Sequence, residues 1–138
     1  MSLFLSKPQP TQVVCHAALG ELRWSVEEKG WLGSIHGVSF CIADEGAAMP
    51  SVELLAYAEG MLCPPTAIFD ALQKEKSAWQ AKYPNSAAEV SQLVYDQVAL
   101  YRHKNRCWAM GLLGPEQDMR AWRVEFQGYK CEGLGFDG

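Results

Sequence analysis

The spacing of apolar residues changes twice along the chain. Apolar and polar residues alternate from Thr11 to Ala43 and again from Tyr95 to Gly135, which is typical of strands with one buried face. Between these blocks, Pro50–Leu93 has apolar residues at three- and four-residue steps, the spacing of amphipathic helices. The pattern predicts an α+β fold. We expect antiparallel β-sheets from the N- and C-terminal thirds and two to three helices in the middle of the chain.

Short turns separate the predicted strands within each block. Glu28-Lys29-Gly30, His36-Gly37 and the polar run Arg102–Arg106 are turn signals, and Gly30 is available for a positive φ angle. Such connections are far too short for a parallel crossover, so the pairing is expected to be antiparallel. Gly114–Asp118 is expected to be a loop. The simplest arrangement is antiparallel sheet covered by the central helices, and two sheets with the helices at one edge is the alternative.

The helical middle carries its own start and stop signals. Pro50-Ser51 is expected to start a first helix, and Pro64-Pro65 to end it and open a second. On the second helix, one face is predicted to carry Phe69, Leu72, Lys76, Trp79 and Tyr83. Ser86-Ala-Ala-Glu89 has the form of a capping box and predicts a short third helix.

Length and composition place the chain among ordinary globular proteins. Its 138 residues, 49% apolar and 20% charged, predict a single domain over residues 11–138, preceded by an extended N-terminal arm at residues 1–10. The net charge of −4 argues against direct nucleic-acid binding, which needs a basic surface. Neither a signal peptide nor an apolar run of about 18 residues is present, so we expect a cytoplasmic protein without membrane contact.

The residues that could carry chemistry do not form a recognisable active site. The five cysteines are widely spaced and odd in number, which predicts free thiols rather than a disulfide framework. His103 and Cys107 are too few for a zinc site, and they lack an orienting carboxylate for hydrolysis. Residues 133–138 spell G-x-G-x-x-G, but no helix follows to bind a pyrophosphate. We therefore expect neither a cofactor nor a metal, and we do not expect an enzyme.

Two segments carry a family resemblance. Leu19-Gly20-Glu21-Leu22 through Gly30-Trp31-Leu32-Gly33 resembles the opening of an uncharacterised bacterial domain family, in which a hairpin leads to a tryptophan- or phenylalanine-marked second strand. The late helical Trp79 and the strand Arg120–Phe126 followed by Gly128 resemble the middle and close of that family. The chain departs from the family at Arg120-Ala121, where a glycine-histidine pair often precedes the final strand.

Domains of that family are often encoded beside polymorphic toxins and are taken to be immunity proteins, including those paired with type VI secretion effectors. The resemblance implies a protein that binds and neutralises a cognate toxin or effector, and a mildly acidic surface suits a basic partner such as a nuclease. The alternative is a non-catalytic binding or regulatory module for another protein or a small ligand. The predicted contact residues are acidic and polar turn residues and one aromatic anchor: Asp44, Glu45, Glu116, Gln117, Asp118 and Trp31.

Overall fold

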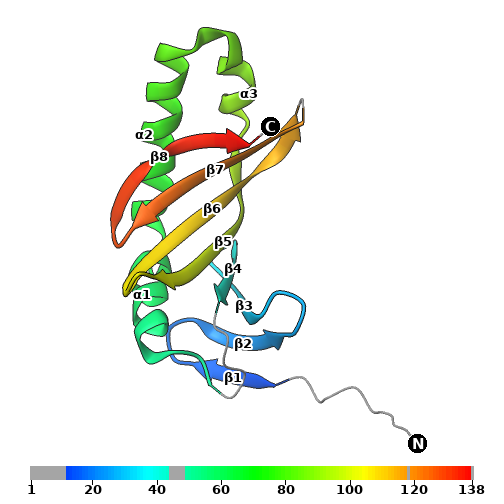
Figure 1. Ribbon diagram of the computed structural model, residues 1–138, viewed down its shortest axis with the longest axis vertical. Coiled ribbons are helices and arrows are strands. Elements are labelled where there is room, and N and C mark those ends of the chain that lie inside the picture. Colours follow the sequence, from blue (N-terminus) through cyan, green and yellow to red (C-terminus); the bar gives the residue numbers. More distant parts are fainter. Residues whose placement is uncertain (1–11, 44–48, 118, 138) are drawn as a thin grey trace, which may run out of the picture.

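The computed structural model describes residues 12–43, 49–117 and 119–137, which form a sheet with helices packed against it (Figure 1). The predicted arm at residues 1–10 lies outside this range. The strands are β1 (Val13–His16), β2 (Gly20–Ser25), β3 (Gly30–Ile35), β4 (Val38–Ala43), β5 (Val94–His103), β6 (Arg106–Gln117), β7 (Arg120–Gln127) and β8 (Lys130–Asp137). The helices are α1 (Val52–Leu62), α2 (Thr66–Lys82), a 3₁₀ turn (Pro84–Ser86) and α3 (Ala87–Ser91). No helix in these residues has the length and apolar character needed to cross a membrane.

The two strand blocks join in a single sheet, which corrects the expectation of separate sheets. The strand order follows the chain from β1 to β8, and every neighbouring pair is antiparallel except β4 and β5. Those two run parallel, with Phe40 opposite Val98. A parallel pair needs a long crossover connection, and α1 to α3 provide it. The α+β class, the central helices and the antiparallel turns within each block were predicted correctly.

Helix α1 begins where the sequence predicts. Ser51 is its N-cap, and the Ser51 Oγ accepts a hydrogen bond from the Leu54 N–H at 3.3 Å. Leu54, Ala58 and Met61 lie on its buried face, and the helix packs on β4 and β5. Burying a large apolar side chain such as Leu54 or Met61 contributes about 1.5–3 kcal/mol, so this face anchors the helical layer at the parallel junction of the sheet.

The buried stripe of helix α2 matches the predicted one only at Leu72 and Lys76. Its buried residues are Ile68, Leu72 and Lys76. Phe69, which was expected on the buried face, is 40% exposed. Lys76 can occupy the stripe because its Nζ donates hydrogen bonds to the carbonyl oxygens of Ser91 at 3.1 Å and Leu93 at 2.9 Å. This lysine therefore fastens the end of α3 to α2.

Strand β6 continues through the segment that was predicted as a loop. It runs to Gln117, but its pairing with β7 shifts between Leu113 and Gln117. The missing N–H of Pro115 is tolerated where the ladder is interrupted. Gln117 then pairs with Arg120 at the tip of the hairpin. Gly114 and Pro115 therefore mark an irregularity within β6 rather than the end of the strand.

The turn between β2 and β3 places its positive φ angle on Lys29, at 54°, and not on Gly30. Gly30 is the first residue of β3. A Cβ atom there would lie 2.6 Å from the Cys41 Sγ and 2.7 Å from the Ile42 carbonyl oxygen. Glycine is therefore needed at this position because β3 and β4 approach closely. The prediction that Gly30 supplies a positive φ angle was wrong.

Candidate functional site

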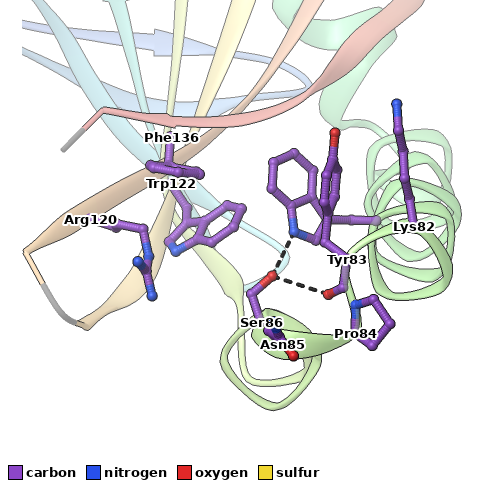
Figure 2. A pocket seen from close by; sticks show the side chains of 9 residues that line it. Lys82, Tyr83, Pro84, Asn85, Ser86, Arg120, Trp122 and Phe136 are labelled. Atoms are coloured by element: carbon purple, nitrogen blue, oxygen red, sulfur yellow. Dashed lines mark hydrogen bonds between the residues drawn. The ribbon is translucent and has the colours of Figure 1, made fainter.

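A pocket of about 610 Å³ lies where the end of α2 and the 3₁₀ turn face β7 and β8 (Figure 2). We call it the aromatic pocket. It is lined by Trp79, Lys82, Tyr83, Pro84, Asn85, Ser86, Arg120, Trp122 and Phe136. In Figure 1 the end of α2 and the start of β7 lie at the end of the molecule that carries α3 and the β6–β7 hairpin, opposite the end that carries β1 and β2. The fold thus brings together two segments that are far apart in the sequence.

Four aromatic rings form the apolar wall. The Trp79 ring centroid lies 4.6 Å from that of Tyr83, 5.1 Å from Trp122 and 6.1 Å from Phe136. Trp122 and Phe136 are partners across β7 and β8, with ring centroids 4.9 Å apart. Trp122 is only 2% exposed, whereas Tyr83 is 43% and Phe136 is 42% exposed. The inner rings therefore hold two outer rings that present apolar surface to solvent.

Ser86 fixes the Trp79 ring rather than capping the helix that follows it. The Trp79 Nε1 donates a hydrogen bond to the Ser86 Oγ at 2.9 Å, and that hydroxyl donates to the Tyr83 carbonyl oxygen at 3.3 Å, as the dashed lines in Figure 2 show. Ser86 is the N-cap residue of α3 but makes no side-chain cap hydrogen bond. The third helix was predicted correctly, but the predicted capping box does not form.

Glu89, the other residue of the predicted capping box, ties α3 to β7. Its side chain is 7% exposed, and its carboxylate accepts hydrogen bonds from the Arg120 guanidinium and from the Trp122 Nε1. Hydrogen bonding from Arg120, supported by Trp122, lowers the pKa of Glu89 below its ordinary value of 4.5, although burial opposes the shift. The carboxylate is therefore ionised at neutral pH and orients both groups.

A cation lies over each of the two half-exposed rings. The Lys82 Nζ is 5.4 Å from the centroid of the Tyr83 ring, and the Arg120 Cζ is 5.5 Å from that of Phe136. Lys82 comes from α2 and Arg120 from β7, so they stand on opposite sides of the pocket (Figure 2). The pocket therefore combines an apolar wall with a positively charged rim.

One of the predicted contact residues, Gln117, is the cross-strand neighbour of a pocket residue. Gln117 pairs with the pocket residue Arg120 in the β6–β7 hairpin, and its Nε2 donates to the Gln92 Oε1 at 2.9 Å. Glu116 precedes it and is exposed. The remaining predicted turn residues, Asp118, Asp44 and Glu45, lie outside the described residues, and their role stays a prediction.

Trp31 does not reach the surface, so the expectation of a partly exposed anchor is wrong. Its side chain is 0% exposed, and its ring centroid lies 5.5 Å from that of Trp24. The register pairs Trp31 with Ile42, which is opposite Leu100 on the next strand. All three side chains project from the buried face, because cross-strand partners point to the same side of a sheet.

The alternative chemistry at Cys107 finds no support in the geometry. Burial and the nearby Glu53 carboxylate raise the pKa of the Cys107 thiol, which disfavours the reactive thiolate. His103 is exposed at the hairpin end. Gly133 and Gly135 both lie within β8 rather than between a strand and a helix. In the part of the chain that the structure describes, no group of three or more histidine, cysteine, aspartate and glutamate residues is arranged to hold a metal ion.

Sequence reasoning did not find the aromatic pocket. It assigned Trp79 to a buried helical face and Trp122 to a core strand, and it interpreted Ser86 and Glu89 as capping residues. One signal was available: Arg120 stands two residues before Trp122, so a cation shares a strand face with a core tryptophan. Such a cation needs a buried partner or a solvent opening, and here Glu89 is the partner.

Comparison with family models, curated proteins and solved structures finds no match to this chain.

Proposed function

We propose that this chain is an immunity protein that binds and neutralises a cognate toxin or secreted effector by stoichiometric contact, without catalysis. The observation that carries the proposal is the aromatic pocket, with its two half-exposed rings beside the exposed end of the β6–β7 hairpin. Tryptophan, tyrosine and arginine are the residue types that dominate binding energy at protein interfaces. The pocket contains all three.

The preorganisation of the pocket supports a binding role. The Trp79 and Trp122 indole N–H groups are both hydrogen-bonded, to Ser86 and Glu89 respectively. Arg120 is held by the same Glu89 carboxylate. Side chains that are already ordered lose little conformational entropy when a partner arrives, so more of the contact energy appears as affinity.

The net charge of −4 favours a partner with a basic surface, such as a nuclease, because long-range attraction speeds encounter. Glu116 extends this charge to the hairpin beside the pocket. In this arrangement the acidic surface steers the partner and the aromatic pocket anchors it.

A coexpression rescue tests the proposal. The C-terminal domain encoded by the adjacent open reading frame is expressed alone, with this chain, and with a Tyr83→Ala, Phe136→Ala double variant. We expect toxicity alone, restored growth and copurification with the natural chain, and loss of the complex with the double variant. Absence of toxicity, or toxicity that the natural chain does not relieve, contradicts the immunity role.

A small-ligand binding module is the second candidate, because a pocket of about 610 Å³ falls within the usual size of small-molecule sites. A metabolite that copurifies with the natural chain, and is absent from the double variant, would support it. Native mass spectrometry of the purified protein makes this measurement and is independent of any toxin partner.

A further inference from the structure

We propose that the aromatic pocket binds a peptide segment of the partner in which a carboxylate stands next to an aromatic side chain. This inference rests on the proposed function, since it names the chemistry by which the partner would be anchored.

The rings define the apolar part of the ligand. Tyr83 and Phe136 leave 43% and 42% of their surface exposed, with the Trp79 ring next to both. An aromatic side chain of the partner would add offset or edge-to-face contacts to rings that are already fixed. The volume of about 610 Å³ leaves space for one such side chain and the neighbouring residue.

The charges define the polar part. The Arg120 charge is balanced by Glu89. Within the described residues, the Lys82 ammonium lies over the Tyr83 ring and forms no ion pair, so the rim keeps a net positive charge. Asn85 also lines the pocket and carries an amide group that can donate hydrogen bonds. The Lys82 ammonium complements a carboxylate.

A cluster of aromatic rings can also bind a cation, and the arrangement argues against that use here. A cation of the chain itself already lies over each of these rings, Lys82 over Tyr83 and Arg120 over Phe136. None of the lining residues is an aspartate or a glutamate. A second cation would meet like charges without a compensating anion, which is unfavourable at short distance.

Peptide binding to the natural full-length chain tests the proposal. The probes are acetyl-Asp-Phe-amide, acetyl-Asn-Phe-amide, acetyl-Lys-Phe-amide and acetyl-Asp-Ala-amide, titrated while the indole N–H signals of Trp79 and Trp122 are followed by NMR. We expect the Asp-Phe peptide to bind about three- to fivefold more tightly than the Asn-Phe peptide, the size of an exposed ion pair. The Lys-Phe and Asp-Ala peptides should be the weakest.

Lys82→Met should remove the preference for Asp-Phe over Asn-Phe, while Lys74→Met, an exposed lysine of the same helix outside the pocket, should keep it. Equal binding of the Asp-Phe and Asn-Phe peptides, tighter binding of Lys-Phe, or no binding of any peptide would overturn the proposal. Successful rescue without the peptide preference leaves the immunity role standing and removes only this inference. If the Asp-Phe preference is seen without rescue, the peptide specificity of the pocket stands and the immunity role is contradicted.

Discussion

The buried Glu89 carboxylate accepts a hydrogen bond from the Trp122 indole, so a residue of the short helix α3 fixes the floor of the aromatic pocket. Arg120 donates to the same carboxylate from the same strand face as Trp122. A single side chain therefore couples the position of α3 to two pocket residues on β7. This coupling makes the pocket sensitive to changes that do not touch its surface.

Removing the cation should cost more stability than neutralising the carboxylate. Arg120→Met leaves a carboxylate that is 7% exposed without its charged partner, and we expect a loss of about 3 kcal/mol in the free energy of unfolding. Glu89→Gln keeps an acceptor for Trp122 and should lose about 1–2 kcal/mol. Urea denaturation of both variants measures which one loses more free energy of unfolding. A larger loss in Glu89→Gln would contradict this account of the pair.

Stability should fall in acid as Glu89 becomes protonated. The pKa of Glu89 is held below its ordinary value of 4.5 by Arg120 and Trp122, so the unfolded chain binds more protons between these two pKa values. The stabilisation is therefore complete above about pH 4.5 and is lost as the pH falls through the lower, folded-state pKa. Denaturation at stepped pH should show a shallower acid slope for Glu89→Gln than for the natural chain. Glu27→Gln, an exposed turn carboxylate, should keep the natural slope.

Phe136→Ala should weaken partner binding strongly and stability little. The ring is 42% exposed and lies at the pocket rim, and truncating an interface anchor of this kind costs about 2 kcal/mol, or roughly 30-fold in Kd. Leu112→Ala is the matched control, because Leu112 is 39% exposed and does not line the pocket. Titration calorimetry with the partner compares the two. Equal losses of affinity in the two variants would show that the pocket is not part of the interface.

Glu116→Lys should slow association with a basic partner about threefold or more, with a smaller effect on dissociation. Glu116 is exposed near the end of β6, whereas Glu27 lies in the turn between β2 and β3, away from the β6–β7 hairpin (Figure 1). Glu27→Lys makes the same change in net charge and serves as the control. Stopped-flow measurement of the association rate constants at low and high salt compares the two variants. Identical rates for both variants would place the contact surface elsewhere.

The sequence predicted most elements of the fold because their signals are local. The Ser51 cap and the apolar spacing of α1 depend on a few neighbouring residues, and both were predicted correctly. The joining of the two strand blocks was not predicted, since the parallel pairing of Phe40 with Val98 depends on residues far apart in the chain. The aromatic pocket was not predicted, because its lining comes from segments far apart in the chain. The expected anchor Trp31 is in the core, and the contact role of Glu116 and Gln117 stays a prediction.

Sequence by itself determined the order of strands and helices, because hydrophobic period, turn residues and helix breakers act over a few positions. Tertiary structure decided what Ser86 and Glu89 do. Their spacing fits a capping box, yet Ser86 accepts from Trp79, and Glu89 accepts from Arg120 and Trp122. Burial beside these donors favours the long-range hydrogen bonds, since an indole N–H or a guanidinium left without a partner in the interior costs more than an uncapped helix end at the surface.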